Sequence, residues 1–188
     1  MKNEEKNNRE KIISTASRLI IEKGVANTSL ADISRELNIS KGTLYYYYPS
    51  KGDLIFDISE RHMEHMTKKI FKWLDKNEKG FSASEILRMI FQAILSSGYR
   101  SHIHVYLIQE AATGNESLKR RFREEYEKWR ELIHNGLKKF LAERPDLEVL
   151  SHIVLATLDG LFLQSLLGIQ SNPLREISQF LVQQDRNT

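Results

Sequence analysis

The stretch from Thr28 to Lys51 reads TSLADISRELNISKGTLYYYYPSK, and its spacing predicts two short helices joined by a tight turn. Thr28 and Ser29 carry side-chain oxygens that can accept hydrogen bonds from the first unpaired N–H groups of a helix. The apolar residues of this first helix recur at helical spacing, at Leu30, Ile33 and Leu37. Asn38 tolerates a left-handed backbone, so we expect the helix to end there.

A second helix is predicted over residues 41–47, with Ser40 as its N-cap. Leu44 and Tyr48 are four residues apart, so they share one face and are expected to point inward. Pro49 closes the helix, because proline disfavours the α conformation of the residue before it.

The flanking sequence is also predicted to be helical. Residues 9–23 place apolar side chains at intervals of three and four, and Gly24 supplies a left-handed stop. Three helices between residues 9 and 47 form a helix-turn-helix pattern. Ser50 and Asp53 form a capping pair for a longer helix over residues 51–76, which a polar loop at 77–80 follows. Further helices are expected from residue 82 or 84 to 95 and over residues 101–113, 116–142, 147–169 and 173–184.

These elements predict an all-α fold of about nine helices. We expect a helix-turn-helix DNA-binding domain over residues 1–55 and a larger helical bundle over residues 56–188. The sequence shows no internal repeat and no low-complexity segment.

The second helix of the opening stretch has the features of a DNA-recognition helix. Such a helix fits the major groove, where its N-terminal residues reach base edges, and helix N-termini bind phosphates. Gly42 costs about 1 kcal/mol against Ala in a helix, which indicates close approach to a partner. Taken alone, Lys41 and Lys51 would be solvated charges, and the tyrosines of residues 45–48 would be ordinary core or surface rings. Together they give the candidate DNA-binding residues Thr28, Ser29, Lys41, Gly42, Thr43, Tyr45, Tyr46, Tyr47 and Lys51.

This segment resembles the DNA-binding domain of the TetR family of bacterial transcriptional regulators. The family pattern has a hydroxyl residue opening one helix, an Ile within it, and a turn into a stretch like S-K-G-T-L-Y-x-H-F-x-S-K. The residues that match that stretch are Ser40, Lys41, Gly42, Thr43, Leu44, Tyr45, Ser50 and Lys51. Tyr47 replaces a frequent His and Tyr48 a frequent Phe, so operator preference does not carry over from a relative.

The resemblance implies that the chain from about residue 56 onward forms a dimerisation and ligand-sensing domain. Residues 147–169 are apolar almost all round, and a helix of that kind needs cover on every side. A second subunit is the expected cover, and a two-fold dimer predicts a roughly palindromic operator. The candidate interface residues are Leu155, Leu158, Asp159, Phe162 and Leu166.

Aromatic and Met side chains recur at helical spacing in this larger domain. Such a composition is typical of a core, and taken together it favours an apolar or aromatic effector over a sugar phosphate. Asp159 could orient such an effector, although the interface is the favoured reading. The candidate ligand-binding residues are Met66, Trp73, Phe91, Tyr106, Phe122, Tyr126 and Trp129.

Several classes of function are disfavoured by composition. The chain has 188 residues and no Cys, which excludes disulfides, thiolate metal sites and a thiol nucleophile. His62 and His65 are three apart, but no third ligand accompanies them, so we expect no metal and no cofactor. Phosphate-loop and hydrolase motifs are missing, so an enzyme is not expected. The charged first eleven residues lack the core of a signal peptide, which favours a cytoplasmic protein without a membrane partner.

The net charge of +3 does not itself indicate a nucleic-acid partner, because residues 1–55 hold nine Lys+Arg against seven Asp+Glu. The motif carries the prediction of a ligand-responsive regulator, most simply a homodimeric repressor that a small effector releases from a double-stranded DNA operator. Two alternatives stay open. One is an activator or a partner-controlled regulator without a small-molecule effector. The other is a helical ligand-binding or scaffold protein that does not read DNA.

Overall fold

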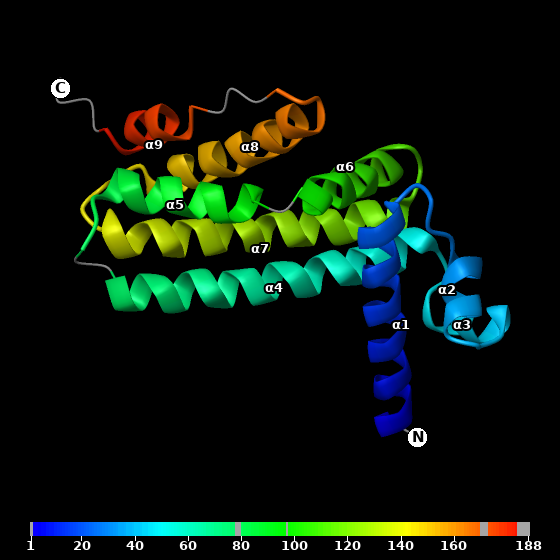
Figure 1. Cartoon of the computed structure of the whole chain (residues 1–188). Coiled ribbons are helices and arrows are strands. Elements are labelled where there is room, and N and C mark those ends of the chain that lie inside the picture. The colour runs from blue at the N-terminus through cyan, green and yellow to red at the C-terminus, as the bar shows by residue number, and fades with distance from the viewer. Residues whose placement is uncertain (1, 78–79, 97, 170–172, 184–188) are drawn as a thin grey trace. The chain divides into compact units, whose positions relative to one another are not determined.

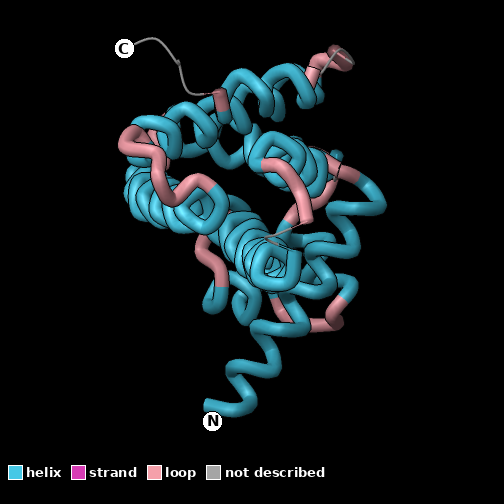
Figure 2. The backbone as a smooth tube through the Cα atoms, turned by 90° about the vertical axis from the view of Figure 1, so that its left-hand side faces the viewer, coloured by secondary structure: helices cyan, strands magenta, loops and turns pink. Residues whose placement is uncertain are grey.

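The computed structural model describes residues 2–77, 80–96, 98–169 and 173–183. Within these ranges the secondary structure is helical, with no strand, as Figures 1 and 2 show. This confirms the predicted all-α fold. The helices are α1 (Lys2–Lys23), α2 (Leu30–Glu36), α3 (Lys41–Tyr47), α4 (Lys51–Asn77), α5 (Ala83–Leu95), α6 (Gly98–Ala112), α7 (Glu116–Phe140), α8 (Leu147–Leu166) and α9 (Leu174–Val182).

The predicted caps and left-handed end residues of the N-terminal helices are confirmed. The backbone is left-handed at Gly24, with φ 83°, and at Asn38, with φ 54°. Ser29 caps α2 in a capping box with Asp32, and the Oγ of Ser40 accepts a hydrogen bond from the Thr43 N–H at the start of α3. Each cap satisfies backbone donors that a short helix leaves unpaired, which fixes where α2 and α3 begin.

Some predicted bounds differ from the structure. Helix α1 begins at Lys2 and not at residue 9, and its residues Glu5 and Asn8 contact Tyr46 and Tyr47 of α3 through their side chains. Helices α7 and α8 end earlier than predicted, at Phe140 and Leu166. Residues 78–79 of the predicted loop and residue 184 of the predicted last helix lie outside the described residues.

The chain divides into two compact units that are not continuous in sequence. The first unit comprises residues 1–63 and 102–119. In it, α1 packs on α2 and α2 packs on α3 (Figure 1). Its core contains side chains from these helices, the start of α4 and α6, including Ile12, Ala16, Ile33, Leu44, Leu54 and Leu107.

The second unit comprises residues 64–101 and 120–188. Helix α5 is its centre, because it packs on both α8 and α9. Its strong amphipathic pattern buries Ile86, Leu87, Phe91 and Ile94.

Helix α8 is long and apolar enough to cross a membrane by length and composition, the one such helix among the described residues. Of its most apolar 18-residue window, 33% is buried inside the protein. The core helix of a soluble protein passes the same test. The apolar composition of α8 therefore raises the question of which surfaces cover this helix.

Candidate nucleic-acid interface

Helix α3 presents one buried and one exposed face. Leu44 and Tyr48 are 0% and 2% exposed, which confirms that they point inward. On the opposite side Tyr45 is 51% and Tyr46 is 74% exposed, and Lys41 is exposed at the N-terminus of the helix. An anchored helix with solvent-facing polar and aromatic side chains can enter the major groove without unpacking.

Gly42 lies in the first turn of this exposed face. A Cβ added there would meet only the Oγ of Ser40, at 3.7 Å, which is an ordinary contact. The packing of the chain itself therefore does not require glycine at this position. This supports the interpretation that an external surface must approach the backbone closely.

Of the two hydroxyl residues at the α2 N-terminus, Ser29 is exposed and Thr28 is buried. Ser29 is exposed, and its hydroxyl and backbone N–H donate to the carboxylate of Asp32, which lowers the pKa of that carboxyl. Thr28 is 1% exposed, and its hydroxyl donates to the carbonyls of Leu19 and Gly24. The Thr28 side chain is enclosed and joins the end of α1 to the start of α2, so it does not face outward as Ser29 does, and its DNA contact stays a prediction.

The N-terminal turns of α1 reach the recognition helix, a feature that the sequence interpretation missed. The Nδ2 of Asn8 donates to the Tyr47 hydroxyl at 3.4 Å, and the Tyr46 hydroxyl lies 3.5 Å from a carboxylate oxygen of Glu5. The polar side chains of residues 1–8, which precede the predicted helix, were the available signal. Helix α1 thus borders the exposed face of α3.

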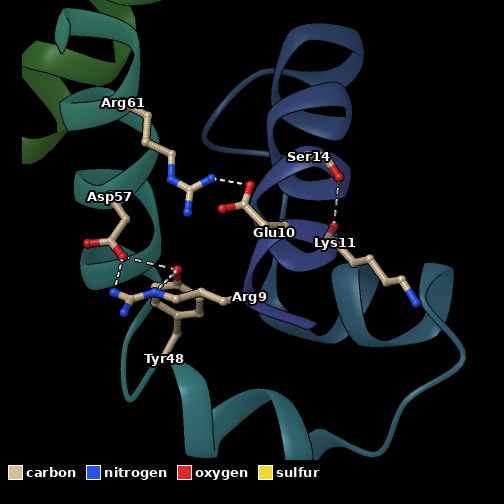
Figure 3. A network of polar contacts seen from close by, with 7 residues as sticks. All are labelled: Arg9, Glu10, Lys11, Ser14, Tyr48, Asp57 and Arg61. Carbon is tan, nitrogen blue, oxygen red and sulfur yellow. Dashed lines mark hydrogen bonds and ion pairs between the residues drawn. The ribbon is translucent and has the colours of Figure 1, made fainter. Parts of the chain in front are cut away.

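A polar network anchors the buried side of α3, and Figure 3 shows it reaching from α1 to α4. The Tyr48 hydroxyl donates to Asp57 at 3.0 Å, and the Arg9 Nε donates to that hydroxyl at 3.0 Å. Arg9 also forms an ion pair with Asp57, and Arg61 forms one with Glu10. Burial raises the pKa of Tyr48 to about 12, so the phenol stays a neutral donor. The network joins three helices around the end of α3.

Lys51 occupies the first turn of α4, where the sequence interpretation expected a phosphate contact. In the structure its ammonium donates to the Val25 carbonyl at 2.5 Å. It also lies 5.2 Å from the centroid of the Tyr106 ring. The ammonium is therefore already bound inside the first unit.

The predicted ligand-binding residues do not form one site. Phe91 is 0% exposed and packs in the core of the second unit, so its ligand contact stays a prediction. Met66 is 7% exposed and Trp73 lies beside Phe81, with ring centroids 5.7 Å apart. Tyr106 belongs to the other unit, against Lys51.

Three of these residues do gather, on one face of α7. The centroid of Tyr126 lies 5.1 Å from that of Trp129 and 6.0 Å from that of Phe122. The Tyr126 hydroxyl donates to Asp159 of α8 at 3.0 Å. Burial, followed by the charge of Asp159, raises the pKa of Tyr126. We call Phe122, Tyr126, Trp129 and Asp159 the aromatic cluster.

The predicted interface residues of α8 are not its most exposed apolar side chains, and their place in a dimer interface stays a prediction. Leu158 is 5% exposed, covered within its own chain, and Asp159 faces Tyr126. Leu155, Phe162 and Leu166 are only partly exposed. The most exposed large apolar side chains are instead Val149 at 59%, Ile153 at 45% and Leu163 at 51% on α8, with the C-cap residue Leu167 at 77%.

Together with Ala156 and Gly160, these four residues form a surface that we call the α8 stripe. Its successive members are alternately four and three residues apart in the sequence. A seam with that period runs along one side of a helix and suits a helical partner. A Cβ built on Gly160 would meet no atom within 4 Å, so the chain leaves open space there.

No cluster of three or more potential metal-ligating side chains occurs among the residues that the structure describes.

Family models match both parts of the chain. Residues 12–58 match the model described as bacterial regulatory proteins, tetR family. Residues 82–180, more than half of the chain, match the model described as transcriptional regulator LmrA/YxaF-like, C-terminal domain.

Two staphylococcal relatives match over different lengths. The chain is 38% identical over 64 residues to an HTH-type transcriptional regulator of Staphylococcus aureus strain USA300, a match that spans 34% of this chain and 35% of that protein. It is 26% identical over 133 residues to the biofilm operon icaADBC HTH-type negative transcriptional regulator IcaR of Staphylococcus epidermidis, covering 70% of this chain and 68% of that protein.

Solved structures share the fold over nearly the whole chain. A transcriptional regulator from Saccharomonospora viridis in complex with choline has a TM-score of 0.68 at 22% identity, covering 94% of both chains. Thermus thermophilus FadR in complex with lauroyl-CoA has a TM-score of 0.71 at 20% identity, covering 92% of this chain and 90% of that one. With an anchored recognition helix and family matches over both parts of the sequence, this chain belongs to the TetR family of bacterial transcriptional regulators.

Proposed function

We propose that this regulator is a repressor that binds a roughly palindromic operator as a homodimer and leaves it when a small apolar or aromatic effector binds. The observation that carries the proposal is the exposed face of α3 beside the buried anchors Leu44 and Tyr48. The relative IcaR is named a negative regulator, which favours repression over activation. We assign DNA binding to residues 1–55, effector sensing and dimerisation to residues 56–188, and the protein to the cytoplasm.

Each side chain on the DNA face has a proposed role. Lys41 and Thr43 lie in the first turn of α3 and Tyr45 lies one turn after Lys41; all three read or flank base edges. Gly42 lets the backbone approach, whereas Ser29, Tyr46 and Tyr47 border the groove and contact phosphates. Arg35, whose side chain is 77% exposed beside Asp32, is a further phosphate contact that the sequence interpretation did not select.

The homodimer is proposed to form through the α8 stripe. Contiguous exposed apolar surface of this length marks an interaction site, and its heptad-like period fits the same helix of a second copy. The open space at Gly160 lets two backbones come close. An isologous contact of this kind pairs two DNA heads, which compensates for the few basic residues on each.

The effector is proposed to bind at the aromatic cluster. Its rings supply apolar surface, and Tyr126 and Asp159 supply a polar pair that can orient a ligand. The neighbours with choline and lauroyl-CoA support small-molecule binding by this fold. Release from DNA requires only that the effector favour a non-binding state by a few kcal/mol.

Selection of genomic fragments by the purified chain tests DNA reading. Recovered fragments are expected to share one inverted repeat, and Lys41→Ala and Tyr45→Ala are expected to weaken binding to it by about 1–3 kcal/mol each. Lys68→Ala, on the exposed surface of α4, is the control. Retention of no fragment would support the non-DNA-binding alternative, and lower expression of the neighbouring gene on deletion would indicate an activator.

Ligand screening tests the effector. We expect apolar acids or aromatic compounds to raise the unfolding temperature and to release the operator, with little effect from sugar phosphates. Trp73→Phe leaves Trp129 as the single tryptophan, so its fluorescence should change on binding. A shift caused only by phosphates would exclude this effector class. No response to any compound would favour control by a protein partner.

A further inference from the structure

Arg100, in the first turn of α6, is a partly buried cation that meets no acidic side chain. Its Nη1 donates to the Sδ of Met66 on α4 at 3.1 Å, and its Nε is buried without a hydrogen-bond partner among the described residues. None of the ion pairs within the described part of the chain includes Arg100. Arg100 and Met66 both belong to the second unit.

This surrounding leaves the guanidinium of Arg100 poorly satisfied. An arginine side chain stays charged and carries several N–H donors, whereas a thioether sulfur is only a weak acceptor. Removing a charge from water is unfavourable unless an opposite charge accompanies it. Arg144 of the same unit is also partly buried, but its guanidinium donates to both carboxylate oxygens of Asp146. Among the described residues, therefore, Arg144 has an acidic partner of the kind that Arg100 lacks.

The first turn of α6 adds to the positive charge of the guanidinium. The N-terminus of a helix carries a partial positive charge, and side chains tilt towards it. This turn contains no acidic residue. Ser101, the next residue, is 1% exposed, and its Oγ is also buried without a partner among the described residues. Buried polar atoms in proteins are usually paired, so a cation and unpaired donors in one turn favour an anionic ligand.

We propose that Arg100 binds the carboxylate of an acidic effector, and that the Met66 thioether occupies the place of this carboxylate in the free protein. A guanidinium holds a carboxylate through two parallel N–H bonds, here from Nε and a neighbouring Nη. Met66 can yield, because its side chain is unbranched and flexible. The Asp159 carboxylate of the aromatic cluster repels an acid, so Arg100 and not the cluster receives the charged group. This inference rests on the proposed effector binding and narrows the effector to an acid.

Matched acidic and neutral compounds test the charge preference. The probes are naphthoate with naphthamide, and decanoate with decanol, each titrated into the whole chain by calorimetry. We expect at least one acid to bind about 10-fold to 100-fold more tightly than its neutral counterpart, because a hydrogen bond to a charged group contributes about that factor. Equal affinities within each pair would overturn the proposal and leave the proposed effector binding intact. Binding of none of the four compounds would overturn both.

Substitution of Arg100 assigns the preference to this side chain. Arg100→Gln should lower the affinity for the acid to that for its neutral counterpart, and the affinity for the neutral compound should not change. Arg100→Lys keeps the charge but not the paired donors, so it should retain part of the preference. Arg144→Gln is the matched control and should bind both compounds as the parent does. An acid preference that survives Arg100→Gln would overturn the proposal.

Urea unfolding without ligand distinguishes a ligand-binding arginine from a structural one. Because Arg100 has no acidic partner to lose among the described residues, Arg100→Gln should leave the urea midpoint unchanged or raise it. Arg144→Gln removes the ion pair with Asp146 and a hydrogen bond to the Leu181 carbonyl, so it should lower the midpoint. A loss in Arg100→Gln as large as that in Arg144→Gln would show that the Arg100 guanidinium holds the fold, and would overturn the proposal.

Discussion

The hydroxyl of Tyr48 donates a 3.0 Å hydrogen bond to the carboxylate of Asp57, nine residues further along the chain. Tyr48 ends the recognition helix and Asp57 lies in the second turn of α4, so this bond joins the two across the Pro49 turn. Arg9 of α1 contacts both groups. The orientation of α3 is thereby fixed by α1 and α4 together.

Removal of the Tyr48 hydroxyl should destabilise the first unit. In Tyr48→Phe the buried Asp57 loses a donor, which should lower the free energy of unfolding by roughly 1–2 kcal/mol. Urea unfolding followed by circular dichroism measures the change. Tyr46→Phe, at a ring that is 74% exposed, is the control and should stay within about 0.5 kcal/mol of the parent. Equal losses in the two variants would contradict a structural role for the Tyr48–Asp57 bond.

Gly42→Ala should separate stability from DNA binding. Because the added Cβ would meet only Ser40 at 3.7 Å, the substitution should keep or raise stability, by up to about 1 kcal/mol. Operator binding should nevertheless weaken, because the methyl group lies where the backbone approaches DNA. On one preparation, unfolding measures the stability and fluorescence anisotropy measures the operator affinity. Unchanged operator affinity would remove Gly42 from the DNA face.

Charged substitutions in the α8 stripe should break the dimer. Ile153→Arg and Leu163→Arg place a charge on side chains that are 45% and 51% exposed in the single chain, so the fold should persist. Sedimentation equilibrium should show monomers, with much weaker operator binding. Ile21→Arg on α1 is the matched control, since Ile21 is 59% exposed and outside the stripe. A dimer that survives both α8 variants would place the interface elsewhere.

The α2 capping box predicts an acid-sensitive contribution to stability. The Ser29 hydroxyl, and next its backbone N–H, lower the pKa of Asp32 in the folded chain. A carboxylate with a lowered folded pKa adds stability above its unfolded pKa, and this stability is lost as the pH falls through the folded value. Asp32→Asn should therefore cost more stability at about pH 6 than at about pH 3.

Urea unfolding at the two pH values tests this sign. Glu131→Gln removes an exposed carboxylate of α7 and controls for net charge. A cost for Asp32→Asn that grows toward acid would contradict the role of the ionised carboxylate.

Local sequence was sufficient to predict the helix-turn-helix. Cap residues, the left-handed turn at Asn38 and the four-residue spacing of Leu44 and Tyr48 act over distances of one or two helical turns, so their consequences could be predicted from the residues alone. The start of α1 could not be predicted in this way. Its first turns contact α3, about forty residues away in the chain.

Only the tertiary structure decided which partner each ambiguous side chain meets. Helix α8 carries apolar residues on two faces, and Leu158 and Leu163 are equally suitable for burial by sequence; packing against the rest of the unit covers the first and leaves the second 51% exposed. Likewise a lysine at a helix start suits a phosphate, yet Val25 and Tyr106 surround Lys51. Periodicity and residue type determine what a face can bind, whereas contacts between distant segments determine which face is already occupied.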